Sequence, residues 1–182
     1  MKGMIFTELL AFIEQNQSYE LVDRIIRKAR LASQGAYTSI GTYDPSEFMQ
    51  LIHALSLETT TPESQLIKEY GEYLFGRFIE KYPGFFKKNT TTFDFLCQVE
   101  SHIHHEVKKY YPDSELPTIC CNAETANCLI LTYESTRPLA DLAEGLIKGC
   151  IRFHKQTIDL KREDLSAHGT KARFILTERT RA

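Results

Sequence analysis

The chain has 182 residues, of which 42% are hydrophobic, and its 22 basic and 24 acidic side chains give a formal net charge of −2. This hydrophobic content supplies a sizeable core and argues against intrinsic disorder. Because no block of like charge stands out, the composition also argues against general binding to nucleic acids or to a membrane surface.

The N-terminal part is predicted to be helical. Apolar residues recur at helical spacing over residues 3–14 and 19–31. A third helix begins after a loop, with Asp44 as its N-cap and Pro45 at its first position.

A fourth helix is predicted from Thr61-Pro62-Glu63-Ser64 to Tyr82-Pro83-Gly84, with Gly71 in its middle. A glycine inside a helix costs about 1 kcal/mol relative to alanine. Gly71 therefore indicates a close backbone approach or a bending point, with a merely tolerated glycine as the alternative.

The C-terminal part is predicted to mix strands with helices. Helices are expected over about residues 92–111, closed by Pro112, and from Pro138 onward. The extended segments are the one after Leu116-Pro117 and the strands 128–133, 157–160 and 171–177. Helices followed mostly by strands predict an α+β fold with a short antiparallel sheet and one inserted helix.

The five cysteines, none of them in a C-x-x-C motif, are predicted to be reduced thiols of a cytoplasmic protein rather than a disulfide framework. They are Cys97, Cys120, Cys121, Cys128 and Cys150. The apolar N-terminus carries Glu8 and lacks a small-residue cleavage site, so no signal peptide is predicted. No apolar run reaches the roughly 18 residues that cross a bilayer.

Three histidines lie within four residues, and a helical wheel separates them. On an α-helix, His104 falls on the flank of the apolar stripe formed by Leu96, Val99, Ile103, Val107 and Tyr110. His102 and His105 fall on the solvated side. His104 is then either a core-edge histidine bonded to a backbone carbonyl or a single axial ligand to a haem iron. Zinc is less suitable, because it needs four ligands and no partner pair is nearby.

Tyr133, Ser135 and Arg137 alternate along the chain, so on a strand they share one face. An arginine grips a carboxylate bidentately, and the two hydroxyls add donors without charge. Three such donors suit a ligand with two carboxylates, such as haem. An ordinary solvated strand face is the alternative.

The chain resembles the haem-nitric oxide/oxygen binding (H-NOX) family, related to the haem domain of soluble guanylate cyclase, over nearly its whole length. The matching segments are Met1-Lys2-Gly3-Met4-Ile5-Phe6, Tyr70-Gly71-Glu72-Tyr73-Leu74-Phe75, Ile103-His104-His105-Glu106-Val107, Tyr111-Pro112, Leu116-Pro117, Tyr133-Glu134-Ser135-Thr136-Arg137 and Leu142-Ala143-Glu144-Gly145-Leu146.

The resemblance implies a single domain over residues 1–182 that holds haem b without covalent attachment. Its N-terminal helical part would span about 1–60, and residues of about 61–182 would cradle the haem, buried between the two parts. His104 would be the proximal iron ligand, Tyr133, Ser135 and Arg137 would hold the propionates, and Pro117 would press on the porphyrin.

The resemblance also implies which gas is bound. The position at which oxygen-binding members carry a distal tyrosine matches Leu142, and two further distal positions match Leu74 and Leu9. With Ile5 nearby, the pocket is expected to be apolar. It would therefore bind nitric oxide, with carbon monoxide as a second candidate, and would exclude oxygen for want of a hydrogen-bond donor.

Some bacterial members carry a structural zinc, but Cys150, His154 and His168 have unsuitable spacings, so no zinc is predicted. The expected protein is a cytoplasmic, bacterial gas sensor in signal transduction. Its partner would be a separate protein, such as a histidine kinase or a cyclic-di-GMP enzyme. Nitric oxide would weaken the iron–histidine bond, and Gly71 and Gly145 match proposed pivots.

Several rival functions are weighed against a gas sensor without catalysis. A haem peroxidase needs polar distal groups, and a metal hydrolase needs paired carboxylates or a metal cluster, neither of which is apparent. An oxygen- or redox-responsive haem protein and a haem-free interaction domain stay open as alternatives.

Overall fold

The computed structural model describes residues 1–86 and 91–179, which form two compact units, Met1–Tyr70 and Gly71–Ala182. The division falls inside one long helix, α4 (Glu63–Lys81). Among the described residues, no helix is long and apolar enough to cross a membrane.

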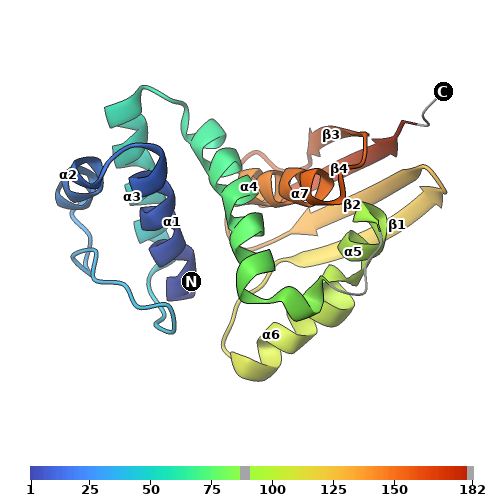
Figure 1. Cartoon of the computed structure of the whole chain (residues 1–182), viewed down its shortest axis with the longest axis horizontal. Coiled ribbons are helices and arrows are strands. Elements are labelled where there is room, and N and C mark those ends of the chain that lie inside the picture. The colour runs from blue at the N-terminus through green and yellow to red at the C-terminus, as the bar shows by residue number, and fades with distance from the viewer. Residues whose placement is uncertain (87–90, 180–182) are drawn as a thin grey trace. The chain divides into compact units, whose positions relative to one another are not determined.

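The first unit is helical (Figure 1). It contains α1 (Gly3–Asn16), α2 (Tyr19–Ala29), α3 (Pro45–Thr59) and the start of α4. Asp44 caps α3 as predicted, because its carboxylate accepts a hydrogen bond from the Ser46 backbone N–H at 2.8 Å. Buried aromatic rings fill the centre of this unit, and the Tyr70 hydroxyl donates to the Ile5 carbonyl oxygen at 2.6 Å.

The second unit combines helices with one antiparallel sheet, which confirms the predicted α+β class. After α4 come a 3₁₀ turn (Pro83–Phe85), α5 (Thr92–Gln98), a π-helical segment (Val99–His104), α6 (His105–Tyr110), β1 (Thr118–Thr125), β2 (Cys128–Glu134), α7 (Ala140–His154), β3 (Ile158–Asp164) and β4 (Lys171–Glu178). Helix α7 begins two residues after the expected Pro138, because Leu139 takes the N-cap position.

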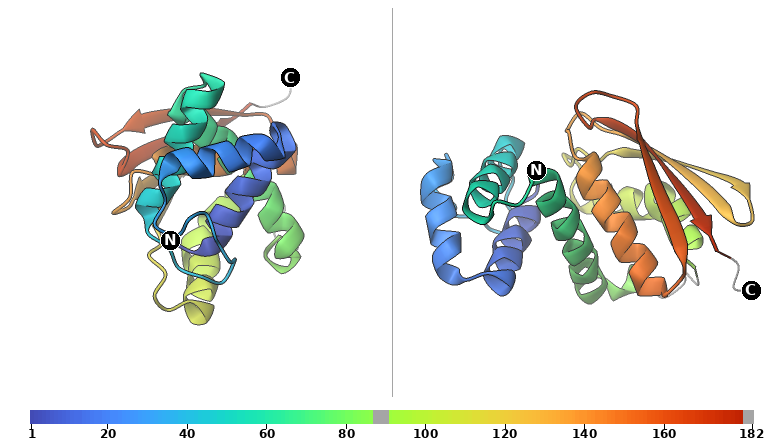
Figure 2. Two further views of the ribbon diagram at one scale, coloured as in Figure 1. Left: turned by 90° about the vertical axis from the view of Figure 1, so that its left-hand side faces the viewer. Right: turned by 90° about the horizontal axis from the view of Figure 1, so that it is seen from above.

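The strands run in the order β1-β2-β4-β3, so β1 and β3 are the edges of the sheet. Alternate residues of β2 and β4, among them Leu129, Leu131 and Phe174, point into one core with Phe95 of α5 and Ile147 of α7. The helices therefore cover one face of the sheet (Figure 2). The edge strand β3 is densely charged, with Asp159, Lys161, Arg162, Glu163 and Asp164 among its seven residues.

Helices α4 and α7 make close backbone contact. A Cβ atom on Gly71 would lie 2.7 Å from the Leu142 carbonyl oxygen and 2.9 Å from the Gly145 Cα. One on Gly149 would lie 2.6 Å from the Phe75 Cβ. Of the alternatives for Gly71, the structure therefore supports the close backbone approach.

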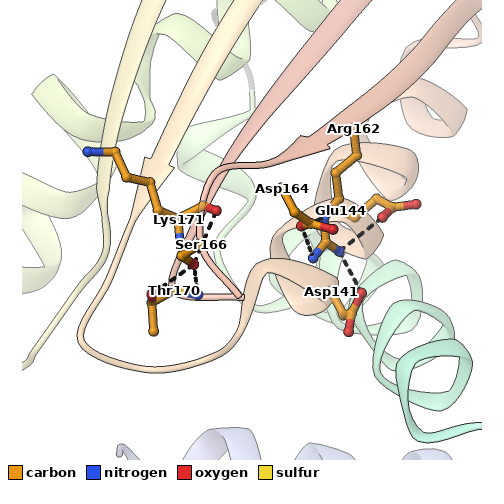
Figure 3. A network of polar contacts seen from close by, with 7 residues as sticks. All are labelled: Asp141, Glu144, Arg162, Asp164, Ser166, Thr170 and Lys171. Carbon is orange, nitrogen blue, oxygen red and sulfur yellow. Dashed lines mark hydrogen bonds and ion pairs between the residues drawn. The ribbon is translucent and has the colours of Figure 1, made fainter. Parts of the chain in front are cut away.

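Arg162 of β3 forms ion pairs with the first turns of α7 (Figure 3). Its guanidinium lies 2.6 Å from Asp141 and 3.4 Å from Glu144 on α7, and 2.6 Å from Asp164 on its own strand. In the hairpin that follows, the Ser166 hydroxyl accepts from the backbone N–H groups of Thr170 and Lys171.

The prediction of five reduced thiols is wrong for one pair. Cys97 of α5 and Cys121 of β1 form a disulfide, with their Cα atoms 5.4 Å apart. The two cysteines are 24 residues apart, so no local spacing motif announces them, and only the packing of α5 beside β1 brings them into bonding range. Cys120, Cys128 and Cys150 are free thiols.

Candidate functional site

The histidine run lies in a helical stretch that is not uniform. Residues Val99–His104 form a π-helical segment between α5 and α6. A π turn holds more residues than an α turn, so residues beyond it are rotated from their positions on an ideal wheel. Tyr110, predicted to lie on the apolar stripe, is consequently 77% exposed.

The predicted difference in burial between His104 and the two neighbouring histidines is confirmed. The His104 side chain is 14% exposed, whereas His102 and His105 are exposed residues. His104 Nδ1 lies 2.9 Å from Glu100 Oε2, so its partner is a carboxylate rather than the backbone carbonyl considered as an alternative. The same oxygen accepts from the Ile119 backbone N–H of β1 at 3.1 Å.

Only the first of the three predicted carboxylate-binding residues lies on a strand. Strand β2 ends at Glu134, so Ser135 and Arg137 lie in the turn before α7, and the expected single strand face is wrong. The turn still gathers the three residues. The Arg137 N–H donates to Ser135 Oγ at 3.1 Å, and the Tyr133 hydroxyl donates to the Arg137 carbonyl at 3.4 Å.

These three side chains do not form a solvated face. Tyr133 is 3% exposed and the Arg137 side chain 17%, while the intervening Glu134 and Thr136 are exposed. Burial raises the pKa of Tyr133, with hydrogen bonding to Ser135 opposing the effect. The Tyr133 hydroxyl therefore stays protonated and remains a hydrogen-bond donor near neutral pH.

Arg137 already holds a carboxylate in this structure. Its guanidinium lies 2.6 Å from the Glu115 carboxylate and 3.3 Å from the Glu115 carbonyl oxygen. The Glu115 carboxylate therefore takes part of the hydrogen-bonding capacity of this guanidinium. Arg137 Nε and the nearby Ser114 Oγ are buried without hydrogen-bond partners among the described residues, so the site has unused polar capacity.

The remaining predicted site residues are apolar and come from several elements. Pro117 directly precedes β1, at the end of the β1–β2 pair where Thr118 lies opposite Glu134, and it is two residues after Glu115 in the chain. In the second unit, Leu142 of α7 is 9% exposed and Leu74 of α4 is 1% exposed. In the first unit, α1 carries Ile5, which is partly buried, and Leu9, which is fully buried.

No group of three or more histidine, cysteine, aspartate or glutamate side chains within residues 1–86 and 91–179 is placed to hold a metal ion. The absence of a structural zinc stays a prediction. His154 lies on α7 against Phe153 and Phe95, and its buried Nε2 has no hydrogen-bond partner in the part of the chain that the structure describes.

The residues of this site fit a haem. A histidine imidazole supplies the one nitrogen ligand that haem iron takes from its proximal side. An arginine whose Nε is buried and unsatisfied, beside tyrosine and serine hydroxyls, suits the propionates. Leu74 of α4 and Leu142 of α7 are buried apolar residues that would line the porphyrin ring.

Sequence reasoning missed two acidic residues. Glu100 and Glu115 both contact predicted site residues. Glu100 stands four residues before His104, a spacing that places side chains together on a helix and could have pointed to it. Glu115 is 22 residues before Arg137, and no sequence pattern predicts their contact.

Comparisons with known proteins identify the family and the fold to which the chain is similar. A family model described as haem-NO-binding (HNOB) matches residues 2–162. The Fe(II) unliganded H-NOX protein from K. algicida is 37% identical, with 100% of this chain and 98% of that chain covered and a TM-score of 0.94. The IWP-051-bound H-NOX from Shewanella woodyi in the Fe(II)CO state is 37% identical, with 98% and 95% covered and a TM-score of 0.84.

A more distant solved structure shows the same fold. The H-NOX protein from S. oneidensis in the Fe(II)NO ligation state is 23% identical, with 99% of this chain and 100% of that chain covered and a TM-score of 0.90. A search of the curated proteins found no match.

Proposed function

The chain belongs to the haem-NO-binding (H-NOX) family of gas-sensing domains, and on this premise we propose that it is a haem-based sensor of nitric oxide. His104 would hold the iron of haem b, while Tyr133, Ser135 and Arg137 would hold the propionates. Ferrous haem would supply the position at which the gas binds.

The observation that carries the proposal is the selective burial of His104. Of three neighbouring histidines, it alone is sheltered, and its Nδ1 is engaged by Glu100. A histidine that holds iron through one ring nitrogen commonly donates a hydrogen bond from the other. The buried, incompletely bonded guanidinium of Arg137 supports the same proposal.

The test is removal of the imidazole at one position. His104→Gly should purify without a Soret band and should regain it when imidazole is present in the growth medium. His105→Gly is the matched control, because that neighbouring histidine is exposed. Normal haem retention by His104→Gly without imidazole would remove this residue from the role.

The choice of gas is expected to follow from apolar distal residues. Leu142, Leu74, Ile5 and Leu9 lack a hydrogen-bond donor, which bound oxygen needs for stabilisation and nitric oxide does not. The ferrous protein should therefore bind nitric oxide and remain unoxygenated in air. Leu142→Tyr should introduce measurable oxygen affinity. Stable oxygen binding by the unmodified protein would contradict the proposed selectivity.

Nitric oxide is proposed to weaken the bond between the iron and His104, freeing the helical stretch that carries this residue. A gas shifts a conformational equilibrium only if it favours one state. The close contact of α4 and α7 at Gly71 and Gly145 provides the proposed pivot. A five-coordinate nitrosyl absorption spectrum is expected, and a persistently six-coordinate one would contradict bond breaking.

The domain is proposed to act without catalysis, in the cytoplasm, on a separate histidine kinase or cyclic-di-GMP enzyme. The H-NOX family supports a sensor rather than an enzyme. A purified candidate kinase should change its autophosphorylation rate between the ferrous and nitric oxide-bound forms of the sensor. Equal rates with both forms would exclude that partner.

A further inference from the structure

Glu100 lies at the centre of a short chain of contacts that the predicted haem site does not include. We propose that Glu100 is a positioning residue for His104, which fixes the orientation and tautomer of its ring and ties it to Ile119 at the edge of the sheet. This inference rests on the proposed function, in which His104 holds the iron.

The tautomer of the His104 ring follows from its contact with Glu100 Oε2, an oxygen that also accepts a hydrogen bond from Ile119. Glu100 Oε2 lies 3.1 Å from the Ile119 backbone nitrogen, which can only donate a hydrogen bond. The same oxygen lies 2.9 Å from His104 Nδ1. An ionised carboxylate accepts both bonds, so Nδ1 carries the hydrogen. The lone pair of the neutral ring then resides on Nε2, the nitrogen left to bind iron.

This hydrogen bond also affects the strength of the ligand. A carboxylate that accepts from Nδ1–H pushes electron density into the imidazole and raises its basicity. The bond is partly sheltered, because the His104 side chain is only 14% exposed, although the Glu100 side chain is 46% exposed. Glu100 is therefore expected to strengthen the bond that nitric oxide has to break.

The second hydrogen bond connects the ligand to the sheet. Strand β1 is an edge strand, so the N–H groups on its outer side need partners from outside the sheet. Glu100 supplies one at Ile119, and Ile119 stands directly opposite Tyr133 in the β1–β2 register. A path of contacts thus joins the proposed iron ligand to the strand that carries a proposed propionate ligand.

An ordinary ion pair on a helix surface does not have this geometry. Asp23 and Arg27 form such a pair at the same i,i+4 spacing, and Glu106 and Lys109 form one at i,i+3. Both join two side chains of one helix, whereas Glu100 bonds a ring and the backbone of a distant strand through one oxygen. Its position at the π-helical segment, a feature often found at functional sites, also sets it apart.

The test compares Glu100→Gln and Glu100→Ala with the control Glu106→Gln, which removes a carboxylate six residues away that bonds Lys109. In the ferrous haem-bound protein, resonance Raman spectroscopy measures the iron–histidine stretching band. The band should shift to lower frequency in Glu100→Gln, shift further in Glu100→Ala and stay unchanged in Glu106→Gln. Haem loss from Glu100→Ala should be about 10- to 100-fold faster.

A second measurement needs no haem. In the haem-free protein, amide hydrogen exchange at Ile119 should accelerate in Glu100→Ala and not in Glu106→Gln, because only Glu100 bonds that N–H. An iron–histidine band that does not move in Glu100→Gln and Glu100→Ala, or unchanged exchange at Ile119, would overturn the positioning role. That outcome leaves the proposed function intact, whereas haem retention by His104→Gly would overturn both.

Discussion

Glu115 is expected to compete with haem for Arg137. In the structure the Arg137 guanidinium is bonded to the Glu115 carboxylate at 2.6 Å. A propionate that takes this guanidinium must first displace Glu115. Replacing the carboxylate in Glu115→Gln should therefore raise haem affinity, whereas Arg137→Met should lower it.

The two effects differ in size because the two side chains differ in burial. The Glu115 side chain is 69% exposed, so its ion pair belongs to the exposed class worth about 0.2–1 kcal/mol. At about 1.4 kcal/mol per tenfold change, Glu115→Gln should raise haem affinity by no more than about 5-fold. The Arg137 side chain is 17% exposed, and a hydrogen bond to a charged group is worth about 1.5–3 kcal/mol. Arg137→Met should thus weaken haem binding by about 10- to 150-fold.

The assay is transfer of haem to excess apomyoglobin, followed through the Soret band. Glu134→Gln is the matched control, because it also removes one negative charge. Glu134 is exposed and stands near Arg137 in the chain, but it pairs with Lys171 instead of Arg137. It should leave haem affinity unchanged. Weaker haem binding by Glu115→Gln would refute the competition, and unchanged binding by Arg137→Met would refute the propionate contact itself.

Three further predictions concern the scaffold. Gly149→Ala should lower the free energy of unfolding by about 1–3 kcal/mol in urea denaturation, because its Cβ would overlap a side chain of α4. Gly76→Ala, whose new Cβ would meet no described atom within 4 Å apart from its neighbours and the backbone of its own helix, should instead raise it by roughly 0.5–1 kcal/mol, and equal effects would contradict the close packing. Burial lowers the pKa of His154 in the folded protein. As the pH falls, the unfolded chain therefore binds a proton at this histidine before the folded protein does. The stability that the neutral His154 contributes should therefore be complete above about pH 6.5 and decrease as the pH drops below it. His154→Phe should flatten that dependence, and an unchanged dependence in this variant would contradict the role of His154. Thiol titration of the unfolded, unreduced protein should find three of the five cysteines, and reduction of Cys97–Cys121 should cost about 3 kcal/mol; five titratable thiols would exclude the disulfide.

The sequence was most informative about features that depend on residues close together in the chain. Hydrophobic periodicity and the Asp44-Pro45 cap predicted the helices of the first unit, and strand-forming residues predicted β2 and β4. The helical wheel separated His104 from His102 and His105 because all three lie within one turn. Over so short a distance, the error that the π-helical segment introduces is small.

The errors arose where tertiary contacts decide the outcome. Tyr110 was misplaced because a π-helical segment has no simple sequence signature and rotates everything after it. Ser135 and Arg137 were assigned to a strand because their alternation continues that of β2, yet they lie in the turn before α7. The contact between Glu115 and Arg137 and the disulfide depend on packing between distant segments, which a single sequence does not reveal.

The charge of β3 has a consequence for self-association. An exposed sheet edge can template the addition of a strand from another molecule, which leads to polymers. Asp159, Lys161, Arg162, Glu163 and Asp164 oppose this at one edge, because an incoming strand would have to strip water from several charged groups. At the opposite edge, the Ile119 N–H already donates a hydrogen bond to Glu100. The β3 margin of the sheet is thus protected against strand-by-strand growth, and Glu100 blocks one pairing position on β1.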